Sequence, residues 1–446
     1  MLRKSSLTLS LLLVVVVPLL LFGAGSSRAD DRDYGRNGGA VNLLAIVPIP
    51  TSDRGTPLVP LRAFDISWVD QATQLYYLGD RSNKSVDVVD AKTNTFVRHI
   101  TGGFTGVVFN ANNTANNDKS GPNGVLVFGP PGRQSLIVTD APSRVVSINL
   151  NNDTIVNPVV FTGGTDAVRA DELAFDPQDG LLLVVNNADS PPFATLIKVN
   201  QQTGVLTQPQ NKEGVDRITF TDATNGAEQP AWDPKTRRFY ISIPEVNGPG
   251  GTGRTGAVKR INPHTATVEA TFLVQDCQPA GLTLGPNQDL LLGCSVVFDT
   301  AGNVWDKNNP NSIAAPTQII LDAKTGEVDA TVKGVGGSDE VWFNPGDGRY
   351  YTASRNNPTG PVLGVIDAER QTLVQIVPTI NTAGNTVTAT RFPAGTAHSV
   401  AVDSRNNHAL VPLPANNVFL DPNDASRTCS NGCIAVFGTP NGGDRD

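Results

Sequence analysis

One pattern of strands and turns recurs seven times along the sequence. In each unit an apolar strand ends in a turn of the DP, GP, NP or DS type, and a second apolar strand follows. Clear copies of this turn are FDPQDG from Phe175, WDPKTR from Trp232 and FNPGDG from Phe343. A later strand closes each unit on another polar turn, at Asp90, Asn149, Asn200, Asn262, Asp322, Asp367 and Gly438. Because the order is constant and the spacing is not, the differences between units fall in loops.

Short apolar runs bounded by Gly, Pro, Asn and Asp are typical of strands and hairpins, so each unit is predicted to be a four-stranded antiparallel sheet. One such sheet cannot bury both faces alone, whereas seven sheets arranged radially each pack against the next. The last unit supplies only three strands, within Val400–Asp403, Ala409–Leu413 and Cys433–Phe437, while Val41–Ile49 is an unassigned apolar strand. We therefore predict an all-β, seven-bladed β-propeller closed by an N-terminal strand that completes the last blade.

The first residues are predicted to be a targeting segment. Arg3 and Lys4 precede the apolar run Leu7 to Phe22, and Ser27 and Ala29 are small residues at the positions that a signal peptidase reads. The alternative is an uncleaved membrane anchor. We predict a signal peptide over 1–29, a disordered mature N-terminus over 30–40, one propeller domain over 41–438 and a tail over 439–446. The mature protein is expected to be periplasmic or secreted, with no stable membrane span.

Composition restricts the partners and the redox chemistry. The net charge of −8 argues against nucleic acid as a partner. An exported chain can form disulfides, and local spacing favours Cys277 with Cys294 and Cys429 with Cys433. Free thiols are the alternative, because four cysteines allow three pairings. Motifs for a nucleotide, haem or flavin are not found in the sequence, so none of these cofactors is expected.

Several units resemble known repeats. DPQDGLLLVVNN with ATLIKVNQQTGVL, and NPGDGRYYTASRNN with LGVIDAERQTLV, resemble the YVTN-type repeats of exported bacterial β-propellers. QPAGLTLGPNQDLLLG, from Gln278 to Gly293, is similar to repeats of the NHL and gluconolactonase-like propellers. The resemblance implies a propeller fold over nearly all of the mature chain. Gluconolactonase-like propellers often place a metal ligand in a Glu-Gly-Pro segment of the first blade, where this chain has FDISWVD from Phe64 to Asp70.

Loop length predicts which face of the propeller binds a ligand. The connections on one face are tight turns such as DPQDG and AKTG. The opposite face receives long segments within 101–122, 187–194, 244–255, 295–316, 355–361, 379–397 and 414–432. Because a fold needs only short connections, length concentrated on one side indicates a functional surface. The alternative is loop growth without function.

The same face receives the residues that begin each innermost strand. Alignment on the DP-type turn places Asp65, Gly124, Asp171, Glu228, Ala280, Asp339 and His398 in one layer and Ile66, Val125, Glu172, Gln229, Gly281, Glu340 and Ser399 in the next. Carboxylates brought together raise one another's pKa or bind a cation. A site of this kind suits Ca²⁺ or Mg²⁺, with candidate ligands Asp171, Glu172, Glu228, Asp339 and Glu340.

Three interpretations of this cluster remain open. In an enzyme, a divalent cation activates water or a carbonyl, and His398, Glu228 and Asp339 are the candidate catalytic residues of a lactonase-like hydrolase or a lyase. In a binding protein, the candidate ligand-binding residues are Asp65, Arg62, Arg81, Gln229, Arg355 and Ser399, and the carboxylates are capped by Arg62, Arg81, Arg169, Arg254, Arg355 or Arg391. In a purely structural role, the acids accept backbone hydrogen bonds.

The leading hypothesis is recognition of a small polar ligand near the central axis on the long-loop face, with metal-assisted hydrolase or lyase chemistry as an extension. The alternative is a scaffold that binds another exported protein. Trp68, Trp232 and Trp342 fall on innermost strands, where packing between blades explains them better than a platform for a cofactor.

Overall fold

The structure is a computed structural model that describes residues 39–164, 168–208, 216–304, 315–358, 360–379, 398–417 and 419–440. The chain divides into Met1–Asp33 and a compact unit, Tyr34–Asp446, and only the second is described below. The predicted signal peptide over 1–29 lies outside the described residues, as do most of the 30–40 segment and of the 439–446 tail.

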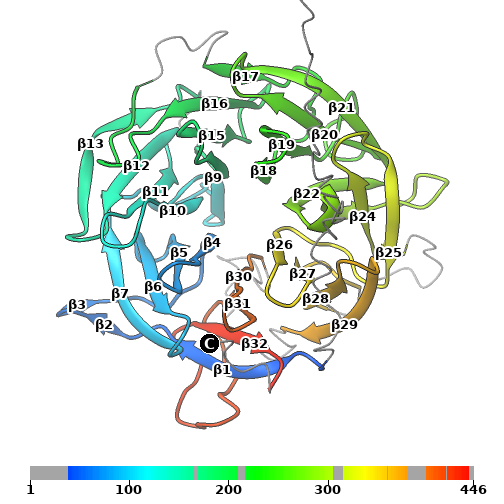
Figure 1. Ribbon diagram of the computed structural model, residues 1–446. Coiled ribbons are helices and arrows are strands. Elements are labelled where there is room, and N and C mark those ends of the chain that lie inside the picture. Colours follow the sequence, from blue (N-terminus) through cyan, green and yellow to red (C-terminus); the bar gives the residue numbers. More distant parts are fainter. Residues whose placement is uncertain are drawn as a thin grey trace, which may run out of the picture. The chain divides into compact units, whose positions relative to one another are not determined.

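The described chain folds almost entirely into antiparallel sheets that follow one another around a central axis (Figure 1). The first two sheets contain β4 (Phe64–Asp70), β5 (Leu75–Asp80), β6 (Ser85–Asp90) and β7 (Thr95–Thr101), then β10 (Val125–Phe128), β11 (Ser135–Asp140), β12 (Arg144–Asn149) and β13 (Thr154–Phe161). The third contains β14 (Leu173–Asp176), β15 (Leu181–Asn186), β16 (Phe193–Lys198) and β17 (Arg217–Thr219). The all-β propeller arrangement predicted from the repeats is confirmed.

An eight-stranded sheet comes next along the chain. It contains β18 (Pro230–Asp233), β19 (Arg238–Ile243), β20 (Thr255–Asn262), β21 (Thr267–Gln275), β22 (Cys277–Leu284), β23 (Asp289–Val297), β24 (Thr317–Asp322) and β25 (Val328–Lys333). A single parallel pair, Thr255 with Cys277, joins β20 to β22. The short 3₁₀ helix η1 (Pro286–Gln288) connects β22 to β23.

The remaining four-stranded sheets contain β26 (Val341–Asn344), β27 (Arg349–Ser354), β28 (Val362–Asp367) and β29 (Thr372–Pro378), and β30 (Ala401–Asp403), β31 (His408–Leu413), β32 (Cys433–Gly438) and β1 (Asn42–Pro48). Two separate two-stranded hairpins are β2 (Ser52–Asp53) with β3 (Thr56–Pro57), and β8 (Gly106–Phe109) with β9 (Ala115–Gly121). The second hairpin lies in a predicted long loop.

The N-terminal strand completes the last sheet, as predicted. β1 pairs antiparallel with β32, for example Ile46 with Ala435, and lies beside it in Figure 1. The Ile46 side chain is fully buried in a cluster that joins this sheet to the sheet of β26–β29. The first and last strands of the ring are thus held together by both a hydrogen-bond ladder and apolar packing.

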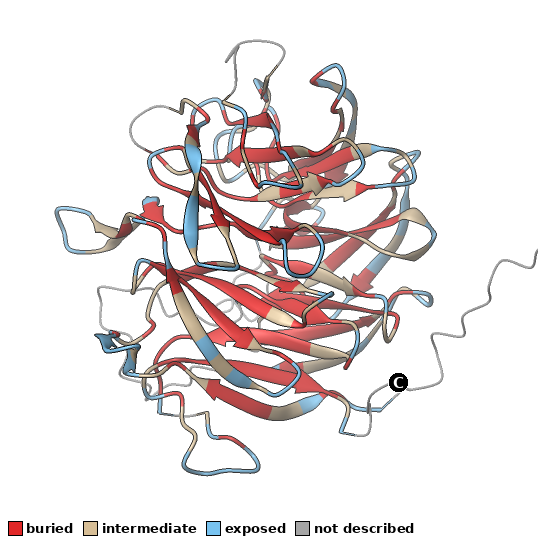
Figure 2. Ribbon diagram, turned by 60° about the vertical axis from the view of Figure 1, so that its left-hand side comes forward, coloured by how far each residue is buried: buried red, intermediate tan, exposed pale blue. Residues whose placement is uncertain are grey.

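Apolar side chains pack between neighbouring sheets. Tyr77 and Val88 of one sheet meet Val125 and Leu136 of the next, for example. A separate cluster packs the β18–β21 half of the eight-stranded sheet against the β22–β25 half. Figure 2 shows the consequence, since the inner strands are buried and exposed residues gather on turns and outer strands.

Side chains hold the tight turns in shape. The Asp176 carboxylate accepts a hydrogen bond of 2.8 Å from the Gln178 backbone N–H, and Asp233 does the same for Lys235 at 2.9 Å. Gly180 ends the first of these turns with φ of 63°, a conformation that favours glycine. The repeated DP turn is therefore a structural device.

Both predicted disulfides are confirmed. Cys277 and Cys294 link the neighbouring strands β22 and β23, with their Cα atoms 5.2 Å apart. Cys429 and Cys433 close a short loop before and at the start of β32, with their Cα atoms 4.9 Å apart. Within the described part of the chain, no helix has the length and apolar character needed to cross a membrane.

Candidate functional site

The residues that begin the innermost strands converge at the axis, although hundreds of residues separate them in sequence. Asp65 of β4 forms an ion pair with Arg81, which follows β5. Its other carboxylate oxygen lies 2.8 Å from Nε2 of His398, which precedes β30. Neighbouring strands thus bring Asp65 and His398 together as the alignment of the repeats predicted.

His398 continues the chain of charges toward a third sheet. Its Nδ1 lies 2.6 Å from Oδ2 of Asp339, and Nη2 of Arg355 lies 2.9 Å from the same oxygen. The result is a continuous row: Arg81, Asp65, His398, Asp339 and Arg355. We call this row the charged layer.

Arg169 links the charged layer to Asp171. Its Nη2 lies 2.7 Å from Asp171 Oδ2, and its Nη1 lies 3.8 Å from Asp65 Oδ2. All three side chains are largely buried, with 11% of Arg169, 3% of Asp171 and 5% of Asp65 exposed. Buried carboxylates need such partners, because an unpaired charge away from water is costly.

The predicted arginine caps are therefore confirmed for Arg81, Arg169 and Arg355. Arg254, just before β20, instead pairs with Asp276, which lies between β21 and β22. Arg62 donates its backbone N–H to Ser82 Oγ at 2.9 Å. Arg391 lies outside the described residues.

The charged layer holds its members in their ionised forms. Burial lowers the pKa of His398, as does the charge of Arg355, but Asp339 and Asp65 outweigh both and raise it to about 9. Burial raises the pKa of Asp339, yet Arg355 and His398 bring it down to about 2. Burial likewise opposes ionisation of Asp65, whose pKa falls well below its usual range because Arg81, His398 and Arg169 surround it.

A second layer lies one residue further along the same strands. The Gln229 amide donates to Glu340 Oε2 at 2.9 Å and accepts the backbone N–H of Leu282 at 2.8 Å. The carboxyl groups of Glu172 and Glu340 hydrogen-bond to each other. Ser399 Oγ, just before β30, lies 2.9 Å from Ser67 Oγ of β4 in the neighbouring sheet. We call Glu172, Gln229 and Glu340 the acid–amide layer.

Four other carboxyl groups near the axis keep their protons more tightly than usual. Burial and the charge of Glu340 raise the pKa of Glu172 well above its ordinary value, and burial with the charge of Asp339 does the same for Glu340. Burial, together with Asp171 and Asp339, raises the pKa of Glu228 to about 8. Burial also raises the pKa of Asp171 to about 7, although Arg169 opposes it.

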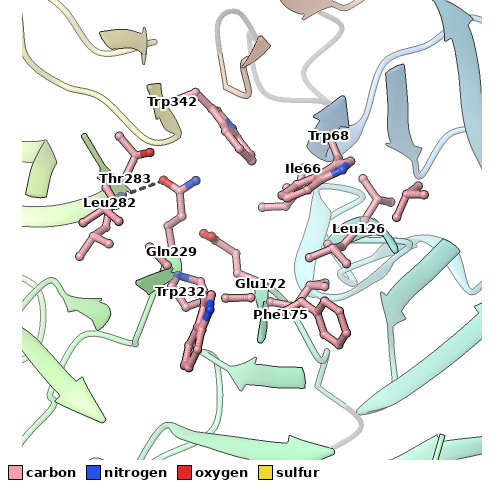
Figure 3. A pocket seen from close by; sticks show the side chains of 18 of the residues that line it. Ile66, Trp68, Leu126, Glu172, Phe175, Gln229, Trp232, Leu282, Thr283 and Trp342 are labelled. Carbon is pink, nitrogen blue, oxygen red and sulfur yellow. Dashed lines mark hydrogen bonds between the residues drawn. The ribbon is translucent and has the colours of Figure 1, made fainter. Parts of the chain in front are cut away.

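Beyond the acid–amide layer the axis opens into a cavity of about 470 Å³. It runs from Glu172, just before β14, to the exposed Pro177 in the turn after that strand, so it reaches the short-turn face. Figure 3 shows the Glu172 carboxyl and the Gln229 amide pointing into it. Trp68, Trp232 and Trp342 line its walls, and the rings of Trp68 and Trp342 meet edge to face at 5.0 Å.

The repeat alignment found both polar layers but missed this cavity. The alignment compared strand beginnings, whereas the cavity depends on the residues two to four positions later. Their apolar character and the three tryptophans were the available signal. A further cavity, of about 740 Å³, lies on the long-loop face and is lined by Glu228, Asn187 and Asn225 among others.

Hydrogen bonds to the buried Glu245 carboxylate hold the GGTG segment at Gly250–Gly253 in its conformation. Backbone N–H groups of Gly250, Gly251 and Gly253 donate to the Glu245 carboxylate at 2.7, 2.6 and 2.8 Å. The side chain of Glu245 thus fills the concavity that these amides form.

Among the described residues, no group of three or more His, Cys, Asp or Glu side chains is placed to hold a metal ion. Of the predicted ligands, Asp171 and Asp339 bind arginine, and Glu172 and Glu340 bind each other. The metal site stays a prediction.

Comparison with known proteins supports the architecture. The sequence matches no protein-family model and no curated protein. A solved structure of Kuenenia stuttgartiensis hydrazine synthase resembles the chain with a TM-score of 0.57, covering 86% of this chain and 98% of that one at 13% identity. At this identity the similarity shows the fold alone.

Proposed function

We propose that this protein is an exported β-propeller that binds a small ligand with a polar end at the central axis. The observation that carries the proposal is the axial cavity closed at its inner end by Glu172 and Gln229. Ligand sites in proteins are mostly apolar concavities of a few hundred Å³ with a small number of polar groups that fix orientation. The cavity meets that description.

Other features support the predicted setting. The two disulfides are compatible with a periplasmic or extracellular location. The apolar clusters between sheets support a count of seven blades. One of these clusters lies between the β18–β21 half and the β22–β25 half of the eight-stranded sheet, as expected if the halves are two blades packed face to face. On that count β18–β21 and β22–β25 are two blades linked by the single pair Thr255 with Cys277.

Tryptophan emission provides a test, because the chain has four tryptophans and three of them line the axial cavity. A library of small polar compounds is screened for an increase in melting temperature, and each hit is then tested for a change in emission. We expect hits to shift the emission of the wild type and to bind a Gln229→Ala variant more weakly. Stabilising compounds that leave the emission unchanged would refute a ligand site in this cavity.

Acid–base chemistry on the long-loop face is a second candidate function. Glu228 lines the cavity there, and its pKa of about 8 keeps a proton available at neutral pH for a general acid. We propose that Glu228 would transfer the proton in a hydrolase or lactonase-like reaction. His398 and Asp339, already paired with each other, would hold its surroundings in place.

A bound Ca²⁺ or Mg²⁺ would extend this second function. Melting with and without a chelator tests it, since a resident cation stabilises the folded state and its removal lowers the melting temperature. An unchanged melting temperature and no metal by elemental analysis would remove the metal. A protein that binds no compound in either cavity would favour the alternative, a scaffold for another exported protein.

A further inference from the structure

The residues that line the axial cavity indicate which charge a ligand should have. Among the described residues that line it, Glu172 has the only ionisable side chain. The remaining lining is apolar or aromatic apart from the Gln229 amide and the Thr283 hydroxyl, and it includes Trp68, Trp232 and Trp342. An anionic ligand would thus meet an acid and no base.

Aromatic faces favour the opposite charge. Indole rings attract a cation through the negative face of the ring, most strongly where the contact is desolvated. Figure 3 shows the Glu172 carboxyl directed toward the Gln229 side chain, with Trp68, Trp232 and Trp342 around the same cavity. One acid among three indoles is an arrangement that suits an alkylated ammonium group.

We propose that the axial cavity binds a small organic cation, with its ammonium group beside Glu172 and its apolar part against the three tryptophans. This inference rests on the proposed function and deepens it by naming the ligand class. The net charge of −8 would also favour the approach of a cation.

Among the described residues, the charged groups that face Glu172 are Glu340, Glu228 and Asp171, which are all carboxyls. Arg169 and His398, the cations of the neighbouring layer, are paired with Asp171 and Asp339. A ligand cation would supply the positive charge that Glu172 has no partner for.

The test uses choline and its neutral isostere 3,3-dimethylbutan-1-ol, which has the same shape without the charge. Binding of each to the full mature protein is measured by tryptophan emission and by calorimetry. We expect choline to bind about ten-fold more tightly or better, as one desolvated cation–π contact predicts.

Two variants locate the effect. Glu172→Gln should weaken the binding of choline more than that of the alcohol and so reduce the preference, and the exposed Glu369→Gln should retain it. Equal binding of the two probes to the wild type, or a preference that Glu172→Gln leaves unchanged, would overturn the inference. The wild-type comparison is decisive even if Glu172→Gln does not fold. If neither probe binds but other compounds shift the emission, the cation is refuted; if no compound does, the proposed function itself fails.

Discussion

His398 should make the stability of the protein depend on pH in a defined window. Its side chain is 21% exposed, and Asp65 and Asp339 hold it at 2.8 and 2.6 Å. Its pKa rises from 6.5 to about 9, which corresponds to about 3 kcal/mol of unfolding free energy. Because the pKa is raised in the folded state, this contribution is complete below pH 6.5 and disappears as the pH rises through 9.

The neighbouring acids also make the unfolding free energy of the protein fall as the pH rises. The pKa values of about 7 for Asp171 and about 8 for Glu228 are also raised, so each of these groups favours the folded state less as the pH increases. The wild type should therefore lose more than the share of His398 between pH 6.5 and pH 9. A variant is needed to separate the terms.

Urea unfolding of the wild type and of His398→Gln at pH 6, 7.5 and 9 measures the share of His398. At pH 6 the variant should be less stable by about 3 kcal/mol, and at pH 9 the difference should fall below about 1 kcal/mol. His264→Gln is the matched control, because that side chain is half exposed, and it should follow the wild type. A difference that stays constant with pH, or a proton NMR titration of His398 with a midpoint near 6.5, would refute the ion-paired assignment.

Three further predictions concern the frame around the site. Ile46→Ala should lower the unfolding free energy by about 2–5 kcal/mol, because it leaves a cavity where β1 closes the ring, and the exposed Asn42→Ala should change it by less than about 0.5 kcal/mol. Replacement of both Cys277 and Cys294 by Ala should cost about 3 kcal/mol, given their separation of 17 residues, and an unchanged melting temperature would argue against the bond. Glu245→Gln should speed amide hydrogen exchange at 250–253 without affecting exchange in β4, and equal protection would contradict the role of the carboxylate as acceptor.

The strand pairing and the disulfides of the propeller could be predicted from the sequence because they follow from repeats and from residues that are close in sequence. The unassigned strand near Ile46 and the three-strand last unit together predicted the pairing of β1 with β32. Cysteine spacing predicted both disulfides because each pair is close in sequence. The repeat alignment also placed Asp65, Asp339 and His398 together, since equivalent positions in a ring of sheets meet at the axis.

The partners within the site depend on side-chain direction, which the alignment does not contain. Arg81 and Asp65 lie on neighbouring strands of one sheet, yet Gln229 reaches Glu340 across the axis from a distant repeat. Which charged group lies beside Glu172 depends on which face of its strand points toward the axis. A shift of one residue in the strand register would turn the Glu172 side chain to the opposite face. The axial cavity could not be predicted because its shape depends on the side-chain directions of residues on several strands at once.

The most direct test of the account is a crystal structure of the protein soaked with choline at a concentration that saturates the emission change. The account predicts density for the ligand on the axis, with its ammonium group beside Glu172 and between the rings of Trp68, Trp232 and Trp342. Ligand density confined to the long-loop face, with the axial cavity filled only by water, would contradict it.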